Sequence, residues 1–235
     1  MIDYINTIDA LGDDVVVDSI IERTITEFKD NTLTKIGNAA FASCTALTEI
    51  ELPNVQKIPT EAFANCTALR KVYLPNVTEI GNQSLENCPV TDVYAPKLRN
   101  VGGSYAMRGW QLTRVTTDLF PELTVIGFGH FMDWTALRYF DLPNITNIQG
   151  HAFLNTKNLV ALILRNENVM CTLSDTNAFA GSSVATGTGY IYVPSALYDQ
   201  YAQATNWATY SAQLRKLEDY TVDGTVSGEL DETKI

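Results

Sequence analysis

The chain has 235 residues, of which 46 % are hydrophobic, and its formal net charge is −11. This length suits one large domain, and the hydrophobic fraction is ordinary for a soluble globular protein. Phosphate contacts need clustered Lys and Arg, which the sequence lacks, so the charge argues against nucleic-acid binding and against attraction to anionic membranes. No apolar run approaches the ~18 residues of a membrane span, so no membrane insertion is predicted.

Residues 1–35 are predicted to form an N-terminal cap that ends in a degenerate first repeat. Phe28 precedes Ile50 by one period of the repeat that follows, although the segment as a whole fits that register imperfectly. The segment 1–11 has two acidic residues, no basic start and no long apolar stretch, so it does not resemble a signal peptide. Either the protein is not exported by that route, or the sequence begins after a cleavage site.

A repeat with a period of 22 residues, shortened by one residue in the third copy, dominates the chain from residue 36 onward. Its positions in the first full copy are Ile36, Gly37, Phe41, Cys44, Leu47, Ile50, Leu52 and Pro53, and the next copy begins at Ile58. Six copies span about residues 36 to 165, and the irregular fourth copy carries Gly102-Gly103. A period of this length with the core L-x-x-I-x-L predicts that each copy is one coil of a leucine-rich solenoid.

The spacing within one copy predicts the structure of the coil. From Phe41 to Ile50 the apolar positions fall three residues apart, which suits a tight helical or 3₁₀ turn. The step then shortens to two between Ile50 and Leu52, which is the period of a strand, and Pro53 ends that strand. One coil buries too little apolar surface to fold alone, so stacked coils with a parallel sheet are expected.

The C-terminal part is predicted to close the solenoid. Ile191-Tyr192-Val193-Pro194 restates the strand signature, so the solenoid is assigned to residues 36–194. Residues 195–218 have an aromatic-rich apolar face, broken near Thr205-Asn206, and are predicted to form a helical cap. Residues 219–235 are polar and are predicted to be an extended or mobile tail.

These repeats carry a family resemblance. The series IGNAAFASCTALTEIELPNV and IPTEAFANCTALRKVYLPNV resemble the BspA-type leucine-rich repeat, whose motif is similar to I-G-x-x-A-F-x-x-C-x-x-L-x-x-I-x-L-P. The resemblance covers roughly residues 25 to 195, with departures at Trp134 and Thr156, which replace the Cys, and in the fourth copy. The family is known from surface and secreted proteins of bacteria, from parasitic protists and from phage. The resemblance therefore implies an adhesin or binding module and no enzyme.

The cysteines Cys44, Cys66 and Cys88 share one repeat position, so they should form a ladder with the inter-strand spacing of ~4.8 Å. Disulfide geometry tolerates such a separation, so an oxidised pair is one alternative. A zinc site is another, although it needs four converging ligands and short C-x₂₋₄-C spacings that the sequence lacks. The favoured interpretation is a buried slot for a small hydrophobe, with no metal and no cofactor.

No pattern of catalytic residues emerges. His130 and His151 precede Phe131 and Phe153 by one and two residues, so they need not face each other. Nothing in the sequence resembles a nucleophile elbow, a phosphate loop or a metal-binding helix. The chain is predicted not to be an enzyme, and the alternative is an active site in the irregular segments 98–118 or 166–190.

The outward face of the stacked strands is the predicted binding surface. In each copy the two residues that flank the central Ile should point away from the core, giving the pairs Glu49 and Glu51, Lys71 and Tyr73, Asp92 and Tyr94, Arg114 and Thr116, Tyr139 and Asp141, and Ala161 and Ile163. Exposed Tyr beside mixed charge is usual in recognition surfaces. The alternative is that Tyr simply suits a strand. The candidate binding residues are Lys71, Tyr73, Asp92, Tyr94, Arg114, Tyr139 and Asp141.

The leading functional hypothesis is a non-enzymatic binding module for adhesion or host-surface recognition. Its partner would be a protein or a glycan on a cell surface, and its location extracellular, on a cell surface or in a virion such as a phage tail. The alternative is a structural or assembly protein of a phage virion or of a cell-surface scaffold.

Overall fold

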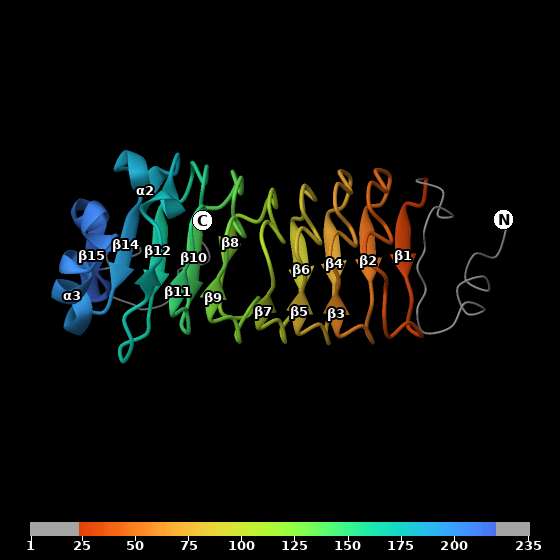
Figure 1. Cartoon of the computed structure of the whole chain (residues 1–235), viewed down its shortest axis with the longest axis horizontal. Helices are drawn as coiled ribbons and strands as arrows, with labels where there is room; N and C mark the ends of the chain where they lie inside the picture. Colours follow the sequence, from red (N-terminus) through yellow and green to blue (C-terminus); the bar gives the residue numbers. More distant parts are fainter. Residues whose placement is uncertain (1–23, 220–235) are drawn as a thin grey trace.

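In the computed structural model, which describes residues 24–219, the coils stack side by side along the long axis of an elongated solenoid (Figure 1). Each regular coil contributes one strand to a front sheet and one short strand to a back sheet. This arrangement confirms the repeat solenoid with parallel strands that the repeat period predicts. The first part of the predicted N-terminal cap and nearly all of the predicted polar tail lie outside the described residues.

The front sheet consists of two parts, and all its strand pairs are parallel. The first part has the order β1-β2-β4-β6, and the second has the order β15-β14-β12-β10-β8. Phe28 pairs with Ile50, so the degenerate first coil stacks in the register predicted for it. The strands are β1 (Glu27–Lys29), β2 (Glu49–Glu51), β4 (Lys71–Tyr73), β6 (Asp92–Tyr94), β8 (Arg114–Val115), β10 (Tyr139–Leu142), β12 (Ala161–Leu164), β14 (Tyr190–Val193) and β15 (Leu214–Lys216).

The back sheet is a feature that the sequence analysis did not predict. It too has two parts, with the orders β3-β5-β7 and β13-β11-β9. Its strands have two residues each: β3 (Lys57–Ile58), β5 (Glu79–Ile80), β7 (Asn100–Val101), β9 (Val125–Ile126), β11 (Asn147–Ile148) and β13 (Thr172–Leu173). Both sheets are interrupted at the irregular coil, between β6 and β8 in front and between β7 and β9 behind.

The turns of each coil follow the regular spacing of its apolar positions. In the first full coil, Cys44 N donates to Phe41 O at 3.2 Å, and Leu47 N donates to Cys44 O at 3.1 Å. Continuous helix does not form there, because Ala39 and Ser43 adopt left-handed backbone with φ of 53° and 61°. Other N–H groups of these turns instead donate to the next coil, which ties neighbouring coils together.

The core is built from ladders of equivalent side chains. The rings of Phe41 and Phe63 stack at 5.0 Å, and farther along Phe131, Phe153 and Phe179 stack at 5.4 Å per step. All of these rings are buried. Because each ring rests on its counterpart in the next coil, apolar burial is shared between coils and stabilises the stack as a whole.

Helices are short and gather at the C-terminal end: η1 (Thr176–Phe179), α2 (Ser183–Thr186), η2 (Ser195–Leu197), α3 (Tyr198–Gln203), η3 (Trp207–Gln213) and η4 (Leu217–Asp219). The predicted helical cap is broken at Asn206, whose φ is 68°, close to the expected position. Tyr201 and Trp207 are buried and cover the end of the core. Residues Leu214–Lys216 differ from the helical prediction, because they form β15, which pairs with β14 and extends the front sheet.

Candidate functional site

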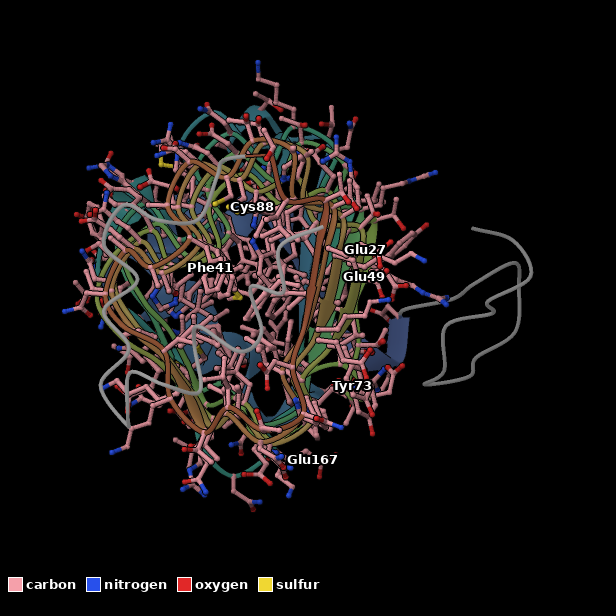
Figure 2. The ribbon with its side chains drawn as sticks, turned by 90° about the vertical axis from the view of Figure 1, so that its right-hand side faces the viewer. Glu27, Phe41, Glu49, Tyr73, Cys88 and Glu167 are labelled. Carbon is pink, nitrogen blue, oxygen red and sulfur yellow. The ribbon has the colours of Figure 1, made fainter. Side chains whose placement is uncertain are left out.

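The outward residues of the front sheet form two rows, which the strand register defines. Figure 2 shows Glu27, Glu49 and Tyr73 projecting from one side of the molecule, while Phe41 points into the interior. The first row contains Glu27, Glu49, Lys71, Asp92, Arg114, Tyr139, Ala161 and Tyr190, and the second contains Lys29, Glu51, Tyr73 and Tyr94 and later Asp141, Ile163 and Tyr192. We call this surface the strand face.

Two tyrosines of the second row form an exposed stacked pair. Tyr73 on β4 pairs in register with Tyr94 on β6, and their rings lie 5.1 Å apart with an interplanar angle of 12°. The exposed fractions are 41 % for Tyr73 and 48 % for Tyr94. The adjacency predicted from the repeat therefore occurs, and the pair presents a flat aromatic surface to solvent.

The other candidate binding residues do not all lie close to the Tyr73 and Tyr94 pair. Lys71 and Asp92 are exposed and lie next to each other in the first row. Arg114 and Tyr139 are half-buried neighbours in the same row, but they lie beyond the interruption between β6 and β8. The seven candidates thus divide into one group on β4 and β6 and another on β8 and β10.

Asp141, the seventh candidate, is only 7 % exposed. Arg165 Nε lies 2.6 Å from its Oδ1, and Arg165 Nη2 lies 2.7 Å from its Oδ2. Both oxygens of this carboxylate thus accept hydrogen bonds in a bidentate ion pair, the geometry that holds a buried charge in place. Asp141 consequently serves the packing of the sheet more directly than it serves an external ligand.

The outward residues of β12 depart from the solvent-facing position expected for them. Ala161 and Ile163 are buried in a small apolar cluster with Tyr139, Tyr192 and Leu217, separate from the main core. Buried on both faces, β12 reads Ala-Leu-Ile-Leu without a polar residue, which is the pattern of a doubly covered strand. The strand face is therefore polar and aromatic near β4 and β6 and apolar near β12.

Three charged residues form ion pairs at the N-terminal edge of the strand face. Lys29 Nζ lies 3.0 Å from Glu49 Oε1 and 3.4 Å from Glu27 Oε2. The hydrogen bond from Lys29 to Glu49 raises the pKa of Lys29. These groups are exposed enough that solvent screens them, so they contribute solubility and charge pattern more than stability.

The cysteine position of the repeat is a buried hydrogen-bond donor site. Cys66 Sγ donates to Phe41 O at 3.1 Å, and Cys88 Sγ donates to Phe63 O at 3.0 Å. Two later coils have Trp in the same place, and its indole N–H donates to the preceding coil, from Trp110 to Leu85 O at 3.2 Å and from Trp134 to Met107 O at 2.6 Å. The donor role, which the sequence analysis missed, explains why Trp can replace Cys.

Burial makes two of the four cysteines, Cys88 and Cys171, poor nucleophiles, whereas a hydrogen bond with Cys88 lowers the pKa of Cys66. Cys44, Cys66, Cys88 and Cys171 are all buried, and no disulfide joins them within residues 24–219. Burial raises the pKa of Cys88, and it raises the pKa of Cys171 to about 12. Because the thiolate is the reactive form, both of these thiols are protonated and inert at neutral pH.

The two histidines do not converge. His130 is buried, with its Nδ1 accepting from Gly127 N at 2.8 Å and its Nε2 lying 3.1 Å from Gly103 O. Burial lowers the pKa of His130 to about 4, so its ring is neutral at pH 7. His151 packs against Phe128, with the ring centres 4.8 Å apart. Neither histidine faces a nucleophile or a second ligand within the described chain.

Two other kinds of site are absent from the described part of the chain. Among residues 24–219, no three His, Cys, Asp or Glu side chains are grouped so that they could hold a metal ion. The helices in that same span are too short and too polar for any of them to cross a membrane.

The repeats match a known family. A family profile for the BspA-type leucine-rich repeat region matches residues 20–109 and 56–186 in six copies. A leucine-rich cell surface protein of Faecalibacterium prausnitzii is 24 % identical with a TM-score of 0.55, covering 72 % of this chain and 47 % of its own. A leucine-rich repeat protein of Bacteroides ovatus is 17 % identical with a TM-score of 0.41, and the match covers 82 % of this chain and 66 % of that protein.

The pneumococcal vaccine antigen PcpA is 12 % identical with a TM-score of 0.31, covering 74 % of this chain and 55 % of its own. No curated protein sequence matches the chain. The chain spans about half the length of the Faecalibacterium structure, and at these identities the structural likeness concerns the fold alone. The family profile, in contrast, covers most of the sequence. The chain belongs to the BspA-type leucine-rich repeat family.

Proposed function

We propose that this chain is a non-enzymatic binding module that attaches to a protein on a cell surface through the strand face at β4 and β6. The observation that carries the proposal is the exposed stacked pair of Tyr73 and Tyr94. A flat sheet surface with an aromatic centre matches the interfaces of protein partners, in which a few buried residues, often Tyr, Trp or Arg, supply most of the binding energy.

The exposure of the pair is unusual within this chain. Among residues 24–219, the other large hydrophobic side chains that are exposed are Val125, Val160 and Val169, which are single aliphatic groups. Isolated exposed aliphatics are normal on protein surfaces, whereas two touching aromatic rings form a continuous apolar patch. The tyrosine pair is therefore the part of the surface with most to gain from burial by a partner.

The surroundings of the pair also resemble a recognition surface. Lys71 and Asp92 occupy the neighbouring row, and Glu51 pairs in register with Tyr73. Charges of both signs at the rim give orientation and partner selection, while the aromatic centre supplies affinity. Tyr192, at the equivalent position on β14, instead packs into the apolar cluster. Packing within the sheet therefore explains the presence of Tyr192. Tyr73 and Tyr94 have no such packing, and we attribute their exposure to binding of a partner.

Cell attachment tests this proposal. The fluorescently labelled full chain is titrated onto cultured epithelial cells, either untreated, trypsin-treated or glycosidase-treated. Truncating an aromatic centre costs about 2 kcal/mol or more, so Tyr73→Ala combined with Tyr94→Ala should weaken attachment at least about 30-fold. Attachment should also be lost after trypsin treatment and persist after glycosidase treatment.

The matched control is Val160→Ala combined with Val169→Ala, which removes two exposed apolar side chains outside the strand face. It should attach like the wild type. Circular dichroism and the thermal midpoint should not change in either double variant, because the side chains point to solvent. Full attachment by the tyrosine variant, or a signal removed by glycosidases but resistant to trypsin, would contradict the proposal.

A further inference from the structure

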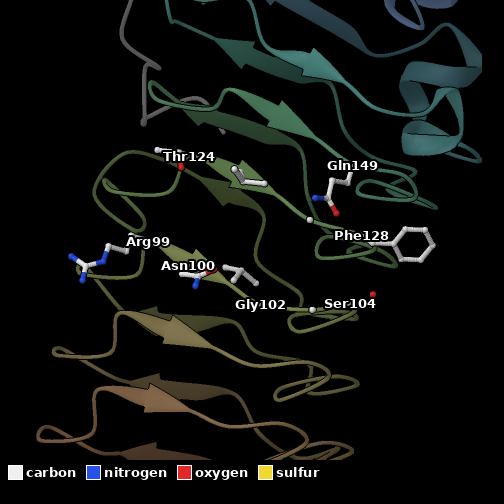
Figure 3. Close-up of a pocket in the computed structure, with 11 residues that line it drawn as sticks. Arg99, Asn100, Gly102, Ser104, Thr124, Phe128 and Gln149 are labelled. Carbon is white, nitrogen blue, oxygen red and sulfur yellow. The ribbon is translucent and has the colours of Figure 1, made fainter.

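A groove with a volume of about 580 Å³ opens on the back of the solenoid, where the back sheet is interrupted (Figure 3). It lies between β7 and β9, the strands on either side of the irregular coil. Val101 and Ile126 occupy the same repeat position, but the stretch of chain between them is longer than one regular repeat. The longer coil separates the two strands, and within the described chain they belong to different sheets.

The interruption is also visible in the hydrogen-bond pattern of the back sheet. In the intact part of the back sheet, Gly81 N donates to Ile58 O and Gly102 N donates to Ile80 O, each at 2.7 Å. By the same register, Gly127 N would donate to Val101 O. It donates instead to Nδ1 of His130, at 2.8 Å.

His130 also connects to the other side of the gap, where its Nε2 lies 3.1 Å from Gly103 O. A Cβ atom on Gly127 would lie 2.3 Å from the His130 ring, so the glycine is what allows the ring to sit there. The His130 ring thus takes the place of the backbone hydrogen bond that would otherwise join Gly127 N to Val101 O. His130 is a positioning residue for the groove, which is a built feature of the fold.

The width of the gap limits what can occupy it. Cα atoms of β7 and β9 come within 8 Å of each other. A peptide strand inserted between two others needs about 9–10 Å, twice the normal inter-strand spacing. An added peptide strand therefore does not fit between β7 and β9, and the part of a ligand that enters the gap must be compact, in the size range of small-ligand sites.

The lining favours an uncharged ligand rich in hydroxyl groups. Asn100, Ser104, Thr124 and Gln149 line the groove, and none of these four side chains forms a hydrogen bond within residues 24–219. Arg99 is the charged residue of the lining, and Figure 3 shows its side chain extending away from the groove. An anionic ligand would lack a counter-charge here, whereas amides and hydroxyls both donate and accept hydrogen bonds.

We propose that this groove binds a neutral saccharide. The two amide side chains and two hydroxyls would exchange hydrogen bonds with the hydroxyls of a sugar, and Val101 and Val125 provide apolar contact. The groove lies on the back sheet, whereas Tyr73 and Tyr94 lie on the front, so the saccharide site is independent of the protein site proposed above.

Calorimetry on the full chain tests the proposal with defined probes: maltohexaose, cellohexaose, xylohexaose, mannohexaose and, as a charged probe, hexagalacturonate. At least one neutral hexasaccharide should bind. Asn100→Ala combined with Gln149→Ala should weaken that binding at least about 10-fold. Two controls should bind the saccharide as the wild type does: Gln56→Ala, which lies just before β3 at the intact part of the back sheet, and Tyr73→Ala combined with Tyr94→Ala.

Amide chemical shifts of the wild type provide a readout that needs no variant. On titration, the changes should concentrate at Val101, Gly103, Ser104 and Thr124. The proposal is overturned if no neutral hexasaccharide binds at millimolar concentration, if the Asn100 and Gln149 variant is folded and binds fully, or if hexagalacturonate binds more tightly. Shift changes confined to the strand face, or affinity lost with the tyrosines, would overturn it as well.

Discussion

Replacing His130 by asparagine should remove part of the loss of stability that the wild-type chain suffers on acidification. The ring of His130 is fully buried, and its Nδ1 accepts from Gly127 N, so the folded chain holds the neutral form. Burial lowers its pKa from 6.5 to about 4. Asparagine places an amide oxygen near the position of Nδ1, so His130→Asn keeps an acceptor for Gly127 but does not titrate.

The sign and size of the effect follow from linkage. Because the pKa of His130 is lower in the folded chain, the unfolded chain binds the proton more tightly. The stabilisation that the neutral His130 ring gives to the folded chain is therefore fully present above pH 6.5. It is lost as the pH falls towards 4, and the full difference corresponds to about 3 kcal/mol of unfolding free energy. Carboxylates also titrate in this window, but they are common to the wild type and the variant.

Urea unfolding at pH 7.5, 5.5 and 4.0 measures the effect as a difference between the two proteins. The wild type should lose about 2–3 kcal/mol more than His130→Asn between the first and last pH. His151→Asn is the matched control, and it should lose as much as the wild type because it retains His130. Equal losses in the wild type and His130→Asn would show that the buried ring is not held in its neutral form.

Three further outcomes are expected. A maleimide reagent should label the cysteine ladder of the first three coils slowly in the native protein and rapidly after denaturation, as mass spectrometry can follow; fast native labelling would contradict the buried donor role. Arg165→Met should lower the unfolding free energy by about 3–5 kcal/mol, because Asp141 is left buried without its partner, and adding Asp141→Asn should restore much of the loss. Gly127→Ala should cost about 2 kcal/mol or more in the same assay, since its Cβ would displace the His130 ring, and a neutral result would show that the gap is not held by that ring.

The strand register was predictable because it depends on a local pattern that recurs. Phe28, Ile50 and Val72 are paired in the structure as their equal spacing along the chain requires. The back sheet was not predictable in this way, because a strand of two residues is too short to show an alternating pattern. Its strands are defined by hydrogen bonds between coils, and the sequence of one coil does not contain that information.

The properties of individual side chains on the strand face were harder to predict. The repeat pattern correctly predicts that Tyr73 and Ile163 point away from the main core. Their exposure to solvent also depends on the side chains of neighbouring coils, and Ile163 is buried by the apolar cluster around it. Predicting that Cys66 donates a hydrogen bond requires knowing where a carbonyl of the preceding coil lies, which the sequence does not show. The replacement of that cysteine by Trp134 was the available sign that an N–H or S–H was needed there.

Photo-cross-linking from the strand face shows directly whether positions 73 and 94 contact the partner. A p-benzoylphenylalanine residue is introduced at position 73, at position 94 or, as a control, at position 160, and each labelled full chain is irradiated on intact epithelial cells. We expect a trypsin-sensitive cross-linked product from positions 73 and 94 and none from position 160. Cross-linking from position 160 alone, or equally from all three positions, would contradict binding through Tyr73 and Tyr94.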